Sequence, residues 1–293
     1  MSIIESAIEK LRRTPSGTPA AAARVGSRVP SETAPVGPVV SQRRIRIDVT
    51  SLRARGEIPE AGQEGPFADY YREIKRPLIQ KALAVEALPE SRLILVSSAL
   101  PEEGKTFTAL NLALSIARER DVSVLLVDAD TPKRHLSHTF GIQEERGLLD
   151  ALADEALDVE SLVLGSDIKG LELLPAGKAA EGTASELIAS ARMAQIAARL
   201  TARYPRRLVL FDSAPLLVSS EARALKQLPG QILLVTRAGR TPRQALFAAL
   251  ALIDEGKLHG LVLNDAYAAG GDGYSDYYGH YGAGASGAQT PEV

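Results

Sequence analysis

The chain has 293 residues, enough for one large domain or two small ones, and 45% of them are hydrophobic while only 4% are aromatic, which predicts an aliphatic core. The net charge of -2 argues against a general nucleic-acid binder and against direct attraction to anionic membranes. Because the chain has no cysteine, disulfides, thiolate metal sites and thiol nucleophiles are excluded.

The first 66 residues are expected to form a short helix followed by a linker. Residues 1–13 place apolar side chains on one helical face behind a capping-box pattern, Ser2 and Glu5, which predicts an amphipathic helix that either frays or docks on a partner. Residues 14–66 predict a largely disordered linker, because their first part is rich in Pro, Ala, Gly and Ser. Within it, "RIRIDV" alternates as a short strand or an extended ligand would.

The sequence predicts an indirect relation to membranes. No apolar run is long enough to span a bilayer, and the stretch "MSIIESAIEKLRRTP" lacks the apolar centre of a signal peptide. We therefore expect a cytoplasmic protein that meets a membrane only through a partner.

An α/β domain is predicted over residues 67–266. It begins with a helix over residues 67–87, which Pro77 would kink or split. From residue 91 onward short apolar runs alternate with helical segments, and the runs are "RLILVSS", "VSVLLVDAD", "LELLPAG", "RLVLFDSAP", "QILLVTRAG" and "LHGLVLND". Strands buried on both faces that alternate with helices predict a doubly wound, mostly parallel sheet. Residues 267–293 follow as a flexible tail rich in Gly and Tyr.

A phosphate-binding loop is predicted at "ALPEEGKT", residues 99–106, between a strand and a helix. It fits the pattern G-x-x-x-x-G-K-[ST] except at its first position. Gly104 lets the backbone approach a phosphate, Lys105 would reach the β- and γ-phosphates, and Thr106 would hold Mg²⁺ through its hydroxyl. The predicted ligand is therefore ATP with Mg²⁺, and the alternative is an exposed loop that merely starts a helix. Nucleotide contacts are predicted for Glu103, Gly104, Lys105, Thr106 and Phe107.

Acidic side chains end two of the predicted strands. Asp128 and Asp130 close "VLLVDAD", and Asp212 closes the apolar part of "LVLFDSAP". Ligands of open parallel sheets bind at the carboxyl ends of strands, and buried carboxylates there need a cation or a partner. One of Asp128 and Asp130 would assist the metal while the other accepts a proton, unless Asp130 caps a helix. Asn264 ends the last strand, where its amide would read adenine or form a turn.

These motifs together resemble the bacterial tyrosine kinases (BY-kinases) of exopolysaccharide synthesis, which belong to the P-loop group of the MinD and ParA ATPases. The features that carry the resemblance are "ALPEEGKT", the additional acidic motif "LLVDAD", "LVLFDSAP" and a C-terminal tyrosine cluster. The stretches "MSIIESAIEKLRR", "YREIKRPL", "ASELIASARM" and "FDSAPLLVSSEA" resemble most the autokinases associated with exosortase and PEP-CTERM gene clusters.

The resemblance implies a Mg-ATP-dependent tyrosine autokinase that phosphorylates its own tail in trans and regulates exopolysaccharide synthesis or export. The implied catalytic residues are Lys105, Asp128, Asp130 and Asp212, with Thr106, Asp130 and Asp212 at the metal. Asp128 would accept the tyrosine proton, in a role that it could exchange with Asp130. The implied phosphorylated residues are Tyr274, Tyr277, Tyr278 and Tyr281.

The resemblance also implies partners. Subunits of the family form a ring through a helix with the pattern E-x-x-R-x-x-R, which Asp69, Arg72 and Lys75 match with two conservative departures. A transmembrane chain-length or co-polymerase protein would activate the kinase and hold it at the inner membrane, and a tyrosine phosphatase would reverse its action. No nucleic-acid partner is implied.

Two departures and two rival functions accompany this interpretation. Leu100 stands where the MinD and ParA relatives carry a second lysine, which argues against a positioning ATPase, and Ala214 replaces the first of two prolines in the third motif. The rivals are a nucleotide-dependent assembly scaffold of the export machinery with little kinase activity, and a MinD-like positioning ATPase.

Overall fold

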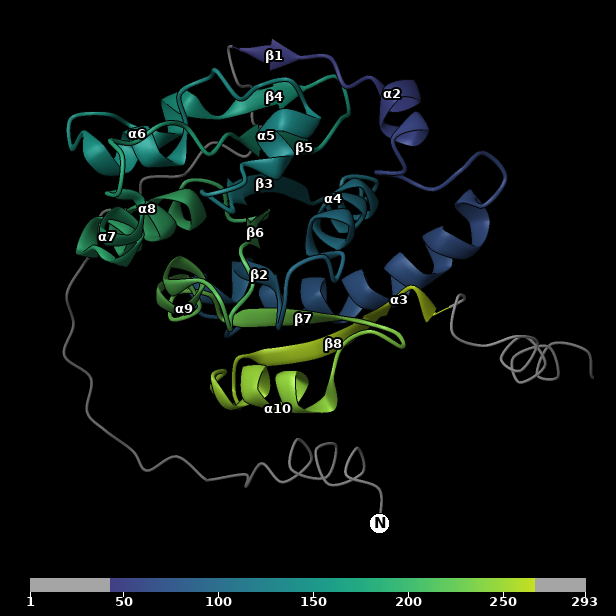
Figure 1. Ribbon diagram of the computed structural model, residues 1–293. Helices are drawn as coiled ribbons and strands as arrows, with labels where there is room; N and C mark the ends of the chain where they lie inside the picture. The colour runs from purple at the N-terminus through teal and green to yellow at the C-terminus, as the bar shows by residue number, and fades with distance from the viewer. Residues whose placement is uncertain (1–42, 267–293) are drawn as a thin grey trace, which may run out of the picture.

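An eight-stranded sheet forms the centre of the computed structural model, which describes residues 43–266 (Figure 1). The strands lie in the order β1-β4-β5-β3-β6-β2-β7-β8, and every neighbouring pair is parallel except β4 with β5. Their bounds are β1 (Arg44–Ile45), β2 (Leu93–Ser98), β3 (Ser123–Ala129), β4 (Leu164–Ser166), β5 (Leu171–Leu174), β6 (Arg207–Ser213), β7 (Gln231–Arg237) and β8 (Leu258–Asn264). The six apolar runs of the sequence form β2, β3, β5, β6, β7 and β8.

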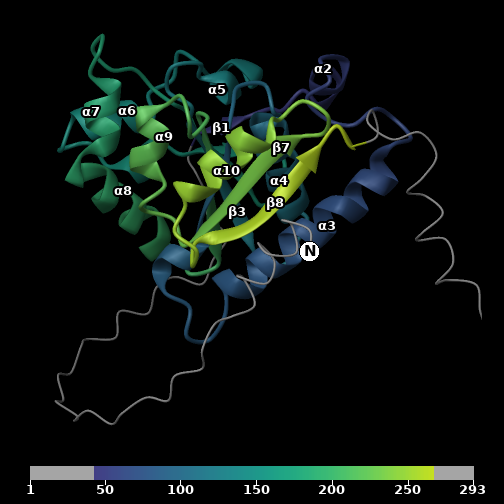
Figure 2. The ribbon, with the colours of Figure 1, turned by 60° about the horizontal axis from the view of Figure 1, so that its bottom comes forward.

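Helices cover both faces of the sheet, so the prediction of a doubly wound, mostly parallel fold is confirmed. One face carries α2 (Val49–Ala54), α3 (Glu64–Ala82), α4 (Lys105–Ile116) and α5 (His135–Thr139). The other carries α6 (Leu148–Ala153), α7 (Ala184–Ala189), α8 (Ala191–Ala202), α9 (Ser220–Leu225) and α10 (Arg243–Ala251). The short 3₁₀ helices are η1 (Pro89–Arg92) and η2 (Val159–Leu162). Figure 2 shows α6 to α9 gathered on the side away from α3.

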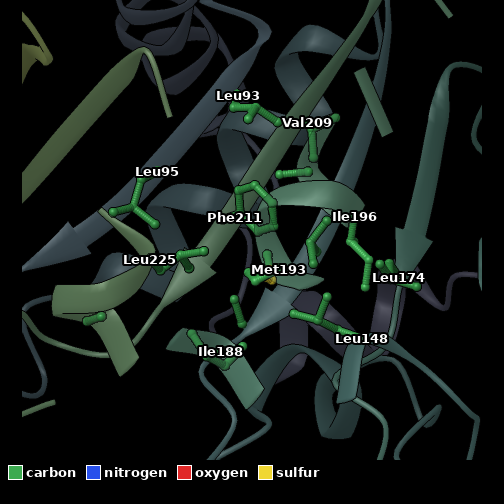
Figure 3. Packing of buried hydrophobic residues seen from close by; sticks show 14 of the residues in the cluster. Leu93, Leu95, Leu148, Leu174, Ile188, Met193, Ile196, Val209, Phe211 and Leu225 are labelled. Atoms are coloured by element: carbon green, nitrogen blue, oxygen red, sulfur yellow. The ribbon is translucent and has the colours of Figure 1, made fainter. Parts of the chain in front are cut away.

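The double covering explains why the strands are apolar at every position. In β2, Leu93 and Leu95 point into the core under α6 to α10, while Ile94 and Val96 point into the core under α3 and α4. Figure 3 shows the first of these cores, where Phe211 of β6 lies among side chains from β2, α8 and α9. Each fully buried aliphatic or aromatic side chain contributes roughly 1.5–3 kcal/mol relative to leaving it exposed.

The structure differs from the expected linker over residues 43–63. The strand β1 pairs with β4, α2 follows, and Ile47, Leu52 and Ile58 are buried in the core on the α3 and α4 face. This segment therefore extends the domain, because its strand pairs with β4 and its three apolar side chains are buried in that core. The predicted helix over residues 1–13 and the tail over residues 267–293 lie outside the described residues.

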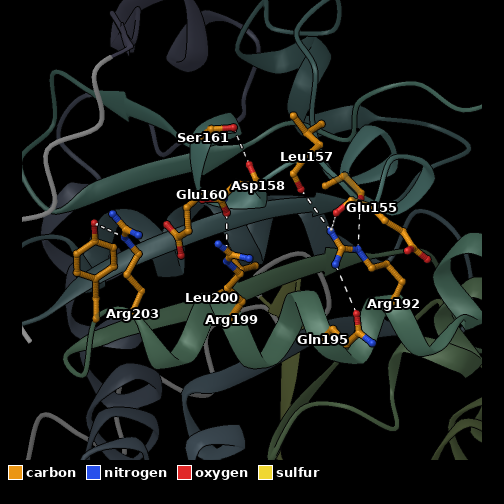
Figure 4. Close-up of polar contacts among 12 residues, drawn as sticks. Glu155, Leu157, Asp158, Glu160, Ser161, Arg192, Gln195, Arg199, Leu200 and Arg203 are labelled. Atoms are coloured by element: carbon orange, nitrogen blue, oxygen red, sulfur yellow. Dashed lines mark hydrogen bonds and ion pairs between the residues drawn. The ribbon is translucent and has the colours of Figure 1, made fainter. Parts of the chain in front are cut away.

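Two helical predictions change in detail. Helix α3 continues through Pro77 without splitting and ends at Ala82, before the predicted boundary. The stretch "SELIASARMAQIAARLTARY" forms α7 and α8, which meet at Ser190 in an extended conformation. Arg192 of α8 donates hydrogen bonds to the carbonyls of Glu155 and Leu157, which fixes α8 against the loop after α6 (Figure 4).

Over residues 43–266 no helix is both long and apolar enough to cross a bilayer.

Candidate functional site

The strand order brings the predicted motifs to one edge of the sheet. The loop over residues 99–104 joins the carboxyl end of β2 to α4, and β2 lies between β6 and β7. The next strand beyond β6 is β3, and its register places Asp128 directly opposite Asp212. The phosphate loop, Asp128 and Asp212 therefore meet at the carboxyl edge, where ligands of such sheets bind.

The loop has the geometry of an anion site. Gly104 precedes α4 with a φ of 91°, a left-handed conformation that L side chains rarely adopt, and an added Cβ would lie 1.9 Å from the Asn264 amide nitrogen. The α4 helix begins at Lys105 and is 12 residues long, so its first amides and the positive end of its dipole face the loop. The loop can thus receive a phosphate group through main-chain N–H groups.

Lys105 lies beside two carboxylates, those of Asp130 and Asp212, and both are nearly inaccessible to solvent. Its ammonium nitrogen is 3.0 Å from Asp130 Oδ2, and Lys105 itself is only 7% exposed. Burial raises the pKa of Asp212 to about 8, although the charge of Lys105 lowers it in part. The carboxyl ends of β3 and β6 thus bring three buried acids, Asp128, Asp130 and Asp212, to a site with one buried cation, so the site is short of positive charge.

A divalent cation fits this deficit. Both carboxylate oxygens of Asp212 and the Oδ1 atom of Asp128 are buried without a hydrogen-bond partner, and carboxylate oxygens are preferred ligands of Mg²⁺. Among residues 43–266 no group of three or more His, Asp or Glu side chains converges as a complete metal cage. A bound Mg²⁺ would therefore be shared among Asp130 and Asp212, the Thr106 hydroxyl, water and the phosphates.

Asp128 is held in place by a residue that no sequence motif singled out. Its Oδ2 atom accepts hydrogen bonds from both the backbone N–H and the hydroxyl of Ser137, each at 2.7 Å. Burial is the largest cause of a raised pKa for Asp128, and these two bonds lower that pKa in part. The second oxygen remains available as a proton acceptor. The Asp130 side chain caps no helix, because α5 is preceded by Arg134 and the Asp130 carboxylate faces Lys105.

The remaining loop residues have specific neighbours. Glu103 is buried, and its carboxylate accepts hydrogen bonds from the Leu100 amide and the Thr241 hydroxyl. The side chain thus links two ends of the loop and connects the loop to the turn after β7. Asn264 donates from its amide nitrogen to the Glu103 carbonyl at 3.1 Å. Phe107 packs edge-on against Phe67 of α3, with ring centroids 6.3 Å apart. The Asn264 amide thus binds the phosphate loop itself, and its expected contact with adenine stays a prediction.

The residues expected at the ring contact do not share one exposed surface. Asp69 and Arg72 are exposed and pair with each other. Lys75 is buried, and its ammonium donates to the Ser115 carbonyl and pairs with Glu119, both at 2.8 Å. Lys75 thus joins α3 to α4 within one subunit. The predicted phosphorylation sites Tyr274, Tyr277, Tyr278 and Tyr281 lie outside the described residues.

Known proteins similar to this chain are bacterial tyrosine kinases. Tyrosine-protein kinase YwqD of Bacillus subtilis is 32% identical over 197 residues, which cover 66% of this chain and 78% of YwqD. The succinoglycan biosynthesis transport protein ExoP of Rhizobium meliloti is 34% identical over 218 residues, or 73% of this chain and 27% of ExoP. The solved kinase domain of the Escherichia coli tyrosine kinase Etk has a TM-score of 0.59 and 27% identity, covering 67% of this chain and 74% of that one.

Several relatives are much longer than this chain. It spans between 24% and 27% of the length of ExoP, of Ptk from Acinetobacter johnsonii and of Wzc from Salmonella typhimurium. No protein-family model matches the chain. The similarity to the solved Etk domain confirms the predicted fold, and the named relatives confirm the predicted family.

Proposed function

The chain belongs to the bacterial protein-tyrosine kinase family, and from that premise we propose that it uses Mg-ATP to phosphorylate the tyrosines of its own C-terminal segment in trans. The observation that carries the proposal is the buried group of Lys105, Asp128, Asp130 and Asp212 at the end of a phosphate loop. Such a group suits phosphoryl transfer, which requires positioning and charge stabilisation more than covalent chemistry.

In this proposal each side chain has a separate task. Amides of the phosphate loop and the Lys105 ammonium bind the phosphates of ATP and stabilise the charge that develops on the transferred group. Mg²⁺, when bound by Thr106, Asp130 and Asp212, would neutralise further phosphate charge. The tyrosine oxygen attacks the γ-phosphorus, the bond to the β–γ bridging oxygen breaks, and ADP leaves.

The tyrosine proton needs an acceptor, and Asp128 supports this role better than Asp130. The Oδ1 atom of Asp128 has no hydrogen-bond partner, while burial holds its pKa above the ordinary value for Asp and so makes it a stronger base. Asp130 is paired with Lys105 and is better placed to compensate charge near the phosphates. The proton would therefore pass to Asp128 as the oxygen–phosphorus bond forms.

We further propose the cellular setting that the relatives suggest. ExoP is named a succinoglycan biosynthesis transport protein, which supports a role in exopolysaccharide synthesis or export. The activating partner would be a transmembrane protein of the export machinery that holds the kinase at the inner membrane, and a tyrosine phosphatase would reset the tail. Self-association would bring one subunit's tyrosines to its neighbour's site, with the exposed Asp69 and Arg72 on the contacting helix rather than Lys75.

The test is Lys105→Met in the full chain, with Lys169→Met as a matched control. Lys169 is exposed in the turn between β4 and β5, away from the carboxyl edge. After incubation with Mg-ATP, intact-mass measurement should show phosphate additions on wild type and Lys169→Met, and none on Lys105→Met. Equal phosphorylation of the Lys105→Met protein would refute the catalytic assignment. A wild type that assembles with ATP but gains no phosphate would instead favour an assembly scaffold.

Transfer in trans has its own experiment. A chain with Tyr274, Tyr277, Tyr278 and Tyr281 all changed to Phe supplies an active site without acceptors, and the Lys105→Met chain supplies acceptors without an active site. Mixed with Mg-ATP, the second chain should gain phosphate, which its different mass reveals. If wild type modifies itself but the mixture yields nothing, transfer occurs within one chain.

A further inference from the structure

A set of contacts at the end of β7 and β8 holds the phosphate loop from outside. Arg237, the last residue of β7, donates from Nη1 to the Glu102 carbonyl at 3.1 Å and from Nε to the Asp265 carboxylate. The same guanidinium thus joins the outermost part of the phosphate loop to the residue that follows β8. We call these three residues, Glu102, Arg237 and Asp265, the arginine clasp.

Two further contacts support the clasp. The Thr241 hydroxyl accepts a hydrogen bond from the Arg237 amide at 2.8 Å and donates to the Glu103 carboxylate, so the turn after β7 is tied to the inside of the loop. Asn264, the last residue of β8, donates to the Glu103 carbonyl. Two successive loop carbonyls, those of Glu102 and Glu103, are therefore bound by side chains from β7 and β8.

Binding these carbonyls orients the loop amides. No described peptide bond is cis, and a trans peptide places its N–H group opposite its C=O group. When Arg237 and Asn264 hold the carbonyls of Glu102 and Glu103, the N–H groups of Glu103 and Gly104 point away from β7 and β8. Glu102 has a left-handed φ of 63°, a conformation that is unfavourable for an L residue, so contacts from outside the loop help to keep this shape.

The clasp also lies where the tyrosine-rich sequence begins. Asp265 directly follows β8, Tyr267 comes two residues later, and the proposed substrate tyrosines follow from Tyr274. We propose that Arg237 is a positioning residue that couples nucleotide binding to the docked position of Asp265. The inference rests on the proposed function for its nucleotide ligand. Because such coupling is reciprocal, nucleotide in the loop favours a docked Asp265, and a docked Asp265 favours nucleotide.

The sharpest test uses Asp265, which contacts Arg237 but makes no hydrogen bond to the phosphate loop. In the full chain, Mg-ADP affinity should fall about tenfold in Arg237→Ala, the size of one charge-assisted hydrogen bond, and about threefold in Asp265→Ala. The double variant should bind no more weakly than Arg237→Ala alone, because Asp265 acts through Arg237. Arg237→Lys should not restore affinity, since an ammonium lacks the planar fork that reaches two acceptors. Arg243→Ala, which removes an exposed charge at the start of α10, is the control and should bind as wild type does.

Hydrogen exchange supplies a readout that a simple loss of stability would not reproduce. Mg-ADP should slow amide exchange in residues 258–266 of wild type and of Arg243→Ala, but not of Arg237→Ala, while exchange in β3 without nucleotide stays alike in all three. Asp265→Ala binding as tightly as wild type, or additive effects in the double variant, would overturn the coupling and leave the kinase proposal intact. A wild type that binds no Mg-ADP would overturn both proposals.

Discussion

The Asp212→Asn variant tests the electrostatics of the site most directly. Asp212 is completely buried, its carboxylate oxygens have no hydrogen-bond partner, and burial raises its pKa to about 8. Asn has nearly the same shape and carries no charge at any pH. The variant should therefore lose Mg-ATP-dependent activity and yet fold at least as stably as wild type above neutral pH.

The sign and size follow from proton linkage. With a native pKa of about 8 and an ordinary unfolded value near 3.8, the folded state of wild type retains a proton that the unfolded state has lost across the pH range between them. The stability of wild type therefore falls as pH rises through that window, and Asp212→Asn lacks this loss. Between pH 6 and pH 8 the difference in unfolding free energy between variant and wild type should move in the variant's favour by about 2 kcal/mol.

Urea unfolding at several pH values, with chelator and without nucleotide, measures this difference. Titrations of other groups cancel when the variant is compared with wild type at each pH. Asp121→Asn, which changes an exposed carboxylate in the turn before β3, is the matched control. A difference between Asp212→Asn and wild type that stays constant from pH 6 to pH 8 would mean that Asp212 is already ionised in the empty site, and the reasoning would fail.

Further predictions concern other parts of the structure. Ser137→Ala removes one of the two hydrogen bonds to Asp128, at a stability cost of about 1 kcal/mol. It should lower the turnover number without changing Mg-ADP affinity. An unchanged turnover number would show that Asp128 does not need this hydrogen bond. Gly104→Ala forces a left-handed backbone on an L residue and meets the Asn264 amide, so unfolding free energy should fall by about 1–2 kcal/mol and Mg-ADP binding should be lost, as calorimetry would test. Burial raises the pKa of Glu172 to about 7, so this group should lower wild-type stability as pH rises from about 4.5 to 7. Its contribution is at most about 1.4 kcal/mol per pH unit. Urea unfolding of Glu172→Gln should show a smaller fall in unfolding free energy over this pH range than wild type does.

Local sequence patterns determined the strands, the loop and the acids of this protein. An apolar run between turn residues predicts a strand because both its faces are buried, and β2, β3 and β6 followed this rule. The phosphate loop is contiguous in the chain, so Gly104, Lys105 and Thr106 could be identified together. The place of Asp128 and Asp212 at strand ends was enough to predict their proximity, because parallel strands end at a common edge.

Only the tertiary structure decided which side chains support those groups. Ser137 beside Asp128, and Arg237 beside Glu102, are contacts across loops and strands whose spacing in the sequence follows no local period. Lys75 matches a motif expected on a surface, yet packing of α3 on α4 buries it against Ser115. Local propensity determines which residues form a helix or a strand. The close packing of these elements determines which partner each buried polar group binds, and no short stretch of the sequence predicts that partner.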